Sequence, residues 1–407
     1  MITLDKTHKV SEWTGRLTLF VLGMSFVFGC TTKEVVVSVE VMNPSAIDRT
    51  QETVSIGIDQ INFLNEGLDP DKILVKPSDG DRCMITQWVD REGDGNPDEL
   101  LFQVSLAAGE KKQYDVFWKE DATEWRPESE VTTYSRFVPE RTDDYTWEND
   151  RVAFRTFGPE AQRLIEAGEP GGTLSSGIDL WLKKVSYSII DSWYAKNAED
   201  PGYYHIEHGE GLDPYHVGAS RGVGGSGVWL GDTLVTSGNF INYRTIATGP
   251  IRTIFELDYA PWSSYGIAET KRISLDLASQ FSKVEVSVKS EDAYPNYTLG
   301  ITLHDEEGRV HLNDSEGTIS YWEPMADGHL GVGVVVDTAS LDSMFVHRSK
   351  VPDQTQAFAR LKPGKNITYF TGFAWTESGQ VSQPGEWAKM LNNQAIILHK
   401  PLIINVK

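Results

Sequence analysis

Apolar and polar residues alternate with a period of two along most of this 407-residue chain. In Lys283–Lys289 every second residue is valine and the others are polar, which is typical of a half-buried β-strand. Arg252–Tyr259 alternates in the same way. Other segments with this pattern or with strand-forming composition are Val35–Val41, Val54–Ile58, Tyr114–Trp118, Val332–Val336, Thr368–Ala374 and Ala395–Leu398.

Helical periodicity is confined to two short segments, Glu160–Ala167 and Glu386–Asn392. The 36 glycines and 18 prolines punctuate the chain as turns do in all-β proteins. We therefore predict an all-β fold: a large antiparallel, supersandwich-like β-sandwich over residues 131–407, carrying the active site, and a smaller β-sandwich over 35–130. The polar Glu120–Pro127 stretch is the predicted boundary, and a single very large sandwich is the alternative.

The first 30 residues read as an export signal. Lys6, Lys9 and Arg16 precede an uncharged run, Leu17–Phe28, that is too short to span a bilayer as a helix. The run ends at Cys30 in a sequence that resembles a bacterial lipobox, although Phe28 stands where a small residue is usual. We predict a signal peptide over 1–29, a lipidated Cys30, a tether over 30–34, and an outer-membrane lipoprotein facing the periplasm or the cell surface. An uncleaved anchor with an incidental cysteine is the alternative.

Composition narrows the function classes. The net charge of −22 argues against nucleic acid, whose phosphates require a basic surface. Cys30 and Cys83 are the chain's two cysteines, so a lipidated Cys30 leaves Cys83 without a disulfide partner and favours a small buried thiol there. The 12 tryptophans and 15 tyrosines suit sugar binding, although aromatic cores give the same count.

Asp90–Glu99 imitates the start of a calcium loop, with oxygen-bearing side chains at alternate positions and Gly95 in the sixth place. The imitation fails at the twelfth place, where Leu101 replaces the bidentate glutamate. A polar hairpin between Ile85–Val89 and Leu100–Val104 is therefore favoured over calcium binding.

Three short segments supply candidate substrate-binding residues. Trp147 is a potential stacking ring beside Glu148 and Arg151, whose carboxylate and guanidinium suit hydroxyl and uronate recognition. Lys184 and Arg252 each place a charge on a predicted strand just after a turn. The alternative in every case is an ordinary sheet residue, including a structural Glu–Arg pair.

The densest chemistry lies between Tyr203 and Arg221. Three of the nine histidines occur here, with acidic and phenolic groups between them and glycines that let backbone approach a ligand. On a strand, His205 and Glu207 would share a face, with His208 turned away. Histidine and tyrosine are common proton-transfer groups, and an arginine can neutralise a carboxylate. The candidate catalytic residues are Tyr204, His205, His208, Tyr215 and Arg221, with Glu210 as a candidate substrate ligand. A transition-metal site at His205, His208 and Glu210, or a structural polar loop, are the alternatives.

An ordered set of motifs resembles one family of Bacteroidetes lipoproteins from polysaccharide-utilisation loci, long known as a domain of unknown function. The resemblance rests on Trp147–Arg151, Gly177–Trp181, Tyr204–His205, Gly209–Gly211, Tyr215, Val217–Gly218, Arg221–Gly222, Gly224–Gly225 and Gly249–Arg252. His216 departs from the pattern, where a lysine is commoner. The resemblance implies an ulvan oligosaccharide dehydratase. Such an enzyme removes water from a non-reducing-end uronic acid and leaves a 4,5-unsaturated sugar.

This chemistry needs a base for the C5 proton, an acid for the departing O4 hydroxyl, and a cation, Arg221 or Arg151, to offset the uronate carboxylate. The mechanism requires no cofactor, although a divalent cation could substitute for the arginine. The expected partner is a uronate-terminated, sulfated oligosaccharide, with membrane contact through the lipid alone. A glycosidase or chain-cleaving lyase using Glu148 and Glu210 is one alternative. A non-catalytic glycan-binding lipoprotein is the other.

Overall fold

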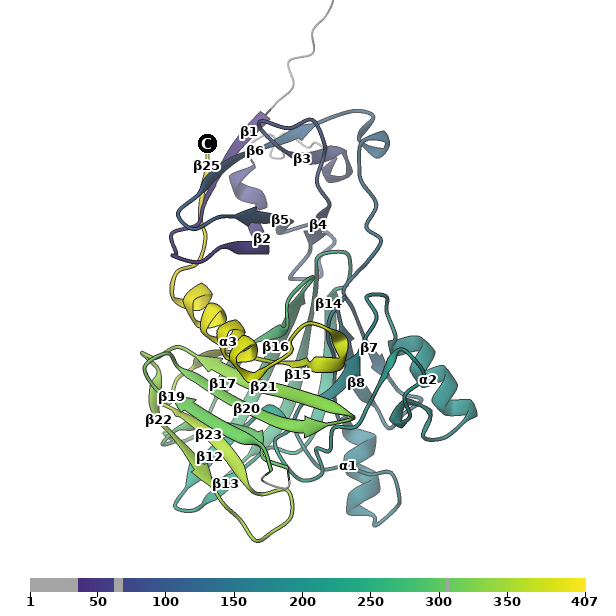
Figure 1. Cartoon of the computed structure of the whole chain (residues 1–407), viewed down its shortest axis with the longest axis vertical. Helices are drawn as coiled ribbons and strands as arrows, with labels where there is room; N and C mark the ends of the chain where they lie inside the picture. Colours follow the sequence, from purple (N-terminus) through teal and green to yellow (C-terminus); the bar gives the residue numbers. More distant parts are fainter. Residues whose placement is uncertain (1–35, 62–68, 305–306) are drawn as a thin grey trace, which may run out of the picture. The chain divides into compact units, whose positions relative to one another are not determined.

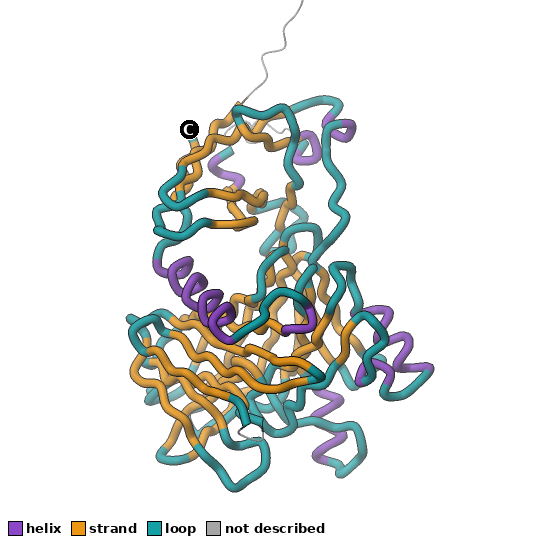
Figure 2. Tube along the Cα trace, in the orientation of Figure 1, coloured by secondary structure: helices purple, strands orange, loops and turns teal. Residues whose placement is uncertain are grey.

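The computed structural model describes residues 36–61, 69–304 and 307–407. Strands dominate these residues, and they form five antiparallel sheets (Figures 1 and 2). The predicted all-β, sandwich-type fold is confirmed. Cys30 and the signal segment lie outside the described residues.

Two sheets near the N-terminus pack their apolar faces together as the smaller sandwich. The first has the order β25 (Ile403–Val406), β1 (Val36–Met42), β6 (Lys111–Trp118), β3 (Ile73–Pro77). The second has the order β2 (Arg49–Gly57), β5 (Glu99–Leu106), β4 (Thr86–Val89). In β1, alternate residues are buried, because the strand turns one face toward the core and the other toward solvent. The C-terminal strand β25 pairs with β1, so the smaller sandwich also includes residues beyond the predicted 35–130 (Figure 1).

The larger sandwich is built around an eight-stranded sheet. Its strands, in spatial order, are β14 (Phe240–Ala247), β15 (Arg252–Trp262), β16 (Ile267–Asp276), β17 (Phe281–Lys289), β24 (Asn366–Trp375), β21 (Gly328–Val336), β20 (Thr318–Met325) and β19 (Arg309–Asn313). Its inner face shares one core with two five-stranded sheets. One consists of β13 (Thr233–Val235), β12 (Val223–Leu230), β18 (Tyr297–Thr302), β23 (Gln356–Leu361) and β22 (Leu341–His347). The other consists of β11 (Gly211–Leu212), β10 (Asp179–Lys183), β9 (Ala153–Thr156), β8 (Asp144–Glu148) and β7 (Tyr134–Val138).

The described residues also form a few helices. The α-helices are α1 (Pro159–Glu166), α2 (Ile190–Glu199) and α3 (Pro384–His399), and the 3₁₀ turns are η1 (Ile58–Gln60), η3 (Pro70–Lys72), η4 (Ala122–Glu124), η5 (Tyr203–His205) and η6 (Thr376–Ser378). None of the described helices is long and apolar enough to cross a membrane. The prediction of a helix near 160–167 is confirmed by α1.

The prediction of a strand at Ala395–Leu398 is wrong, because this segment is the last part of α3. Trp387, Leu391 and Ala395 recur at four-residue spacing and pack on the outer face of the eight-stranded sheet. The run of apolar residues that suggests a strand is therefore the buried side of a helix.

Candidate functional site

The histidine-rich segment is a tight turn followed by a short strand. Gly202 adopts a left-handed conformation (φ 96°) and is followed by the single turn η5. The loop then returns, so that the Asp213 amide donates to the Tyr204 carbonyl at 2.7 Å. The expectation that His205 and Glu207 share a strand face is wrong. Glu207 instead accepts the Gly211 amide at 3.0 Å, which stabilises the loop.

Glycine at position 211 holds this loop against β10. Its φ is +113°, and a Cβ there would lie 1.9 Å from the Leu182 carbonyl oxygen. Any other residue would separate β11 from β10. The sequence therefore positions the loop of His205 on the end sheet, β11-β10-β9-β8-β7, of the larger sandwich.

His205 has one ring nitrogen fixed and the other free. Its Nδ1 lies 2.7 Å from the Asp213 carbonyl oxygen, which can only accept, so Nδ1 carries the proton. In the neutral ring this leaves a lone pair on Nε2, for which no described residue supplies a hydrogen bond. The side chain is 55% exposed, and its ring rests edge-to-face on Tyr204 at 4.6 Å. His205 is therefore oriented as a base is in an active site.

Beneath His205 lies a buried group of charges that we call the Arg155 cluster: Arg155, Asp144, Asp179 and Asp213. Arg155 donates from Nε to Asp179 at 2.8 Å and from Nη2 to Asp213 at 2.9 Å. Asp144 lies 3.9 Å from its Nη1 and pairs with Arg141 at 3.0 Å. The guanidinium lies over the rings of Trp181, Tyr204 and Phe157.

The electrostatics of the cluster favour a neutral Asp213. Burial, together with the charge of Asp179, raises the pKa of Asp213 well above its usual range. Burial alone would lower the pKa of the Arg155 guanidinium. The three carboxyl groups outweigh this effect and raise that pKa well above normal. The arginine therefore stays charged while Asp213 favours its protonated form.

Several buried polar atoms around the cluster lack hydrogen-bond partners among the described residues. They include Arg155 Nη1, Asp213 Oδ1, Trp181 Nε1 and Tyr215 Oη. A buried polar group without a partner costs about 1–3 kcal/mol, so such atoms are uncommon and concentrate where a structure serves a function. The unpaired atoms of a buried arginine and a buried carboxyl group, below an exposed imidazole, make this the candidate active site.

A second histidine–carboxylate pair lies beside Tyr215. His304 Nδ1 is 3.0 Å from Glu323, its Nε2 is 2.7 Å from the His216 carbonyl oxygen, and its ring meets Tyr215 edge-to-face at 4.6 Å. Burial alone would lower the pKa of His304, but the hydrogen bond and charge of Glu323 raise it overall. Both nitrogens are occupied, so His304 holds the loop of Tyr215 in place. This pair is not predictable from local pattern, because 19 residues separate His304 from Glu323.

Comparison with known proteins shows which family the chain belongs to. A family model described as Domain of unknown function (DUF4861) matches residues 41–404. The chain belongs to this family. The DUF4861 chain is 43% identical over 373 residues to the uncharacterized protein P7 of Formosa agariphila, covering 91% of this chain and 93% of that protein. The match confirms the resemblance to a domain of unknown function.

A solved structure supports the architecture. An α-mannosidase from Enterococcus faecalis V583 superposes with a TM-score of 0.53 at 10% identity. The aligned region covers 91% of the DUF4861 chain, which spans 46% of the mannosidase chain. At this identity the likeness shows the fold alone.

The other residues predicted from the histidine-rich segment lie around its surface. His208 stacks on Tyr203 with ring centroids 4.0 Å apart. Glu210 accepts hydrogen bonds from Tyr187 at 2.8 Å and Trp193 at 3.0 Å, which fixes α2 to the loop. His205, His208 and Glu210 thus have separate partners. Among the described residues, no three or more histidine, cysteine, aspartate or glutamate side chains are arranged so that they could hold a metal ion.

Lys184 and Arg221 have different surroundings. Lys184 pairs with Glu207 at 2.8 Å over the ring of Trp375, so its charge is largely satisfied. Arg221 is only 4% exposed and donates to Ser176 at 3.1 Å and to the Ala219 carbonyl at 3.3 Å. Burial lowers the pKa of Arg221 to about 10. A uronate could reach this guanidinium only after the surrounding loop moved.

Trp147 and Glu148 are structural in this fold, contrary to their expected contact with sugar. Trp147 is fully buried and donates to Ser282 at 2.8 Å. Glu148 is also buried, pairs with Lys183 at 2.7 Å and accepts the Ile189 amide at 2.9 Å. Both lie on β8, where all five residues face protein, so the polar pattern of this strand reflects an internal ion pair.

Arg151 and Arg252 line one cleft of about 680 Å³, enclosed by β2, the outer face of β16 and β17, and α3. Arg252 pairs with both oxygens of Asp276, whereas Arg151 contacts Gln280 at 3.3 Å. The structure therefore separates these two arginines, on another face of the large sandwich, from the loop of His205.

The remaining candidates are structural. Asp90 accepts the amides of Gly93 and Gly95, both at 2.7 Å, and closes the β4–β5 hairpin that the sequence favoured over a calcium loop. Cys83 is partly buried and packs against a small apolar cluster. Burial raises the pKa of its thiol, which disfavours a thiolate.

Proposed function

We propose that the chain is a carbohydrate dehydratase that acts on ulvan-type oligosaccharides. It would remove water from the non-reducing-end uronic acid and leave a 4,5-unsaturated uronyl terminus. The observation that supports this most is the state of His205: Nδ1 is held by a carbonyl, Nε2 has no partner among the described residues, and a buried ionic cluster lies below. Family membership extends over the whole segment that carries these residues.

In the proposed reaction, His205 Nε2 takes the C5 proton of the uronate. The electron pair of the C5–H bond forms the C4=C5 double bond, and the C4–O bond breaks. The O4 hydroxyl leaves as water after it receives a proton. In glucuronate the C5 proton and O4 lie on the same side, so one imidazole can accept the first proton and then return it to O4.

The carboxylate of the uronate needs a cation nearby, because negative charge develops on it as C5 loses its proton. Arg141 is our proposed partner. Its guanidinium is partly exposed, lies 3.0 Å from Asp144 and borders the Arg155 cluster. Asp213 is too buried to touch the sugar and acts as a positioning residue for His205.

A glycosidase mechanism receives less support. The carboxylates predicted to serve it are Glu148 and Glu210, and Glu148 is buried against Lys183. A paired-carboxylate mechanism needs both groups beside the glycosidic bond. Glu148 cannot reach a sugar without unfolding the end sheet.

The test is the product formed from uronate-terminated oligosaccharides. Ultraviolet absorbance reports the new double bond, and mass spectrometry reports the loss of one water with the chain length unchanged. Shorter fragments would replace the proposal with a glycosidase or lyase. Binding without any product would identify a glycan-binding protein.

We further propose that this activity is tethered to the outer membrane through a lipid on Cys30. Labelling cells with a radioactive fatty acid should mark the natural protein and leave Cys30→Ala unlabelled. Equal labelling of both would contradict the tether while leaving the dehydratase proposal intact.

A further inference from the structure

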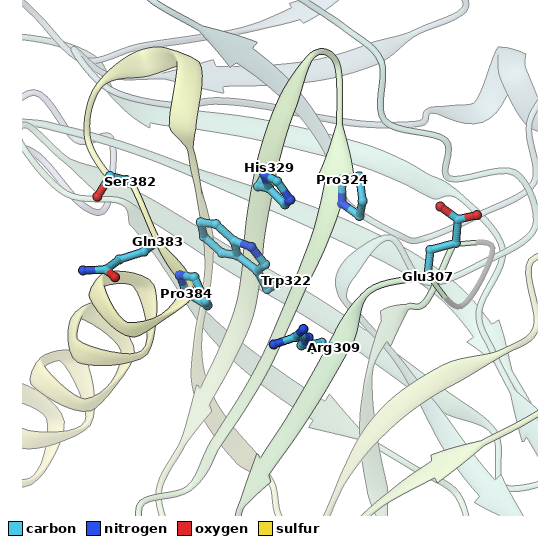
Figure 3. A pocket seen from close by; sticks show the side chains of 8 residues that line it. All are labelled: Glu307, Arg309, Trp322, Pro324, His329, Ser382, Gln383 and Pro384. Atoms are coloured by element: carbon cyan, nitrogen blue, oxygen red, sulfur yellow. The ribbon is translucent and has the colours of Figure 1, made fainter.

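A second concave site lies on the outer face of the eight-stranded sheet. It is a cavity of about 360 Å³ lined by Glu307, Arg309, Trp322, Pro324, His329, Ser382, Gln383 and Pro384 (Figure 3). We call it the Trp322 cavity. Its residues come from three neighbouring strands, β19, β20 and β21, from the turn before β19 that holds Glu307, and from the start of α3 with the two residues before it. None of them belongs to the Arg155 cluster or to the loop of His205.

The floor of the Trp322 cavity is rigid. Arg309 lies directly opposite Trp322 in the β19–β20 register, and Gly331 lies opposite Trp322 on β21. A side chain at Gly331 would collide with Trp387, whose indole occupies that position. His329 stacks on Trp322 with centroids 5.7 Å apart and an interplanar angle of 11°.

Two hydrogen-bonding groups that line the cavity have no partner among the described residues. Trp322 is only 8% exposed, yet its indole N–H forms no hydrogen bond with a described residue. The Arg309 guanidinium lies in the cavity wall beside it and forms no ion pair within the described part of the chain. Figure 3 shows Trp322 between Arg309 and His329. An unpaired indole N–H next to a cation that forms no ion pair among the described residues favours an oxyanion.

The cavity also carries the features that suit a sugar ring. Pro324, His329 and the edge of Trp322 provide apolar surface, while Gln383 and Glu307 provide an amide and a hydrogen-bond acceptor for hydroxyl groups. The volume lies within the range of about 300–1,000 Å³ that small-molecule sites occupy. Glu307 opposes a ligand that is only an anion and favours one with hydroxyl donors.

We propose that the Trp322 cavity binds a pyranose that carries an oxyanion, either a carboxylate or a sulfate ester. Arg309 and the Trp322 N–H hold the oxyanion, and Glu307 and Gln383 hold ring hydroxyls. This binding site does not depend on the proposed dehydratase reaction, and it gives the protein a second hold on an acidic glycan.

Calorimetric titration of the full chain tests the site. The protein used carries His205→Asn, so that no substrate is turned over during the titration. The probes are a uronate-free sulfated oligosaccharide, a uronate-terminated oligosaccharide and a neutral oligosaccharide of equal length. We expect acidic sugars to bind at least about tenfold more tightly than neutral ones, and Arg309→Ala to lose about tenfold in affinity, or 1.4 kcal/mol. Binding of only one acidic probe identifies the oxyanion as carboxylate or sulfate.

Two further variants separate the cavity from general charge and from folding. Arg82→Ala removes an exposed arginine from the smaller sandwich. It changes the net charge by the same amount as Arg309→Ala but away from the cavity, so this variant should bind the acidic sugars like the parent. Trp322→Phe keeps an aromatic floor but removes the N–H, and should weaken the oxyanion probe several-fold at an unchanged unfolding temperature. The inference is overturned if Arg309→Ala binds like the parent, if neutral sugar binds equally well, or if no acidic sugar binds. These outcomes leave the dehydratase test unaffected.

Discussion

His205 and His304 both lie beside a carboxyl group, yet the surroundings leave them with opposite capacities. His205 bonds through one nitrogen to a main-chain carbonyl and is more than half exposed. His304 bonds through both nitrogens, to Glu323 and to the His216 carbonyl, and its side chain is 14% exposed. A free lone pair at the surface can take a proton from a substrate, whereas a ring with both nitrogens bonded is fixed in place.

The carboxyl groups beside the two histidines also differ in their partners and in their charge. Glu323 faces His304 directly and favours its charged form. The side chain of Asp213 instead accepts a hydrogen bond from Arg155 and favours its neutral form, and its backbone oxygen orients His205. A histidine near an acid is therefore a poor guide to chemistry until the partners of both nitrogens are known.

The largest effect is expected from removing the free nitrogen. His205→Asn should lower the turnover rate by about 10²- to 10⁴-fold, because general acid–base catalysis contributes that much. Its unfolding temperature should change little, since the side chain is exposed. Initial rates of absorbance increase on a uronate-terminated oligosaccharide measure the change. His311→Asn, on the exposed side of β19, is the matched control and should retain the parental rate.

The Arg155 cluster should respond unequally to loss of its carboxylates. Asp179→Asn should destabilise the fold by about 3–5 kcal/mol, because it breaks a buried ion pair that Arg155 makes through two nitrogens. Asp213→Asn should cost about 1 kcal/mol or less, since an amide replaces a carboxyl group that already favours its neutral form. Urea unfolding curves compare the two. Equal losses would show that Asp213 is charged in the folded protein.

The His304–Glu323 pair should make stability depend on pH. Because the folded-state pKa of His304 is raised, its contribution is complete below about pH 6.5, the ordinary value, and disappears as pH rises through the folded-state pKa. Glu323→Gln should cost about 1–3 kcal/mol below pH 6.5 and should flatten this pH dependence. Thermal unfolding at a series of pH values measures it. A Glu323→Gln curve parallel to the parental curve would assign the dependence to another group.

The smallest effect is expected at Tyr215. Its hydroxyl is buried without a partner among the described residues, so Tyr215→Phe should leave stability within about 1 kcal/mol or raise it slightly. Chemical denaturation tests this. A loss above that range would mean that a bound water or ligand satisfies the hydroxyl in solution.

The sequence predicted the strands well, because alternation is a local property and a half-buried strand displays it directly. Local pattern failed at Ala395–Leu398, where packing on the eight-stranded sheet selects a helix. It also missed α2, whose buried residues contact the aromatic cluster of Trp181.

The candidate site was predictable only in part. His205 stood out because histidines are scarce and gather in its segment. Arg155 and Asp213 are 58 residues apart, and His304 and Glu323 are 19 apart, so only the fold brings each pair together. Trp147 and Glu148 were wrongly predicted to contact sugar for the same reason. A sequence does not reveal whether a polar strand faces solvent or an internal lysine.

The most direct test of the central claim is chemical rescue of the missing imidazole. In His205→Gly, added imidazole can enter the exposed position and take the C5 proton, whereas in His304→Gly the lost ring is structural. We predict that imidazole restores formation of the unsaturated product in His205→Gly, saturably and with a rate that follows the fraction of neutral imidazole, and has no such effect on His304→Gly. Parental turnover in His205→Gly without imidazole would contradict the account.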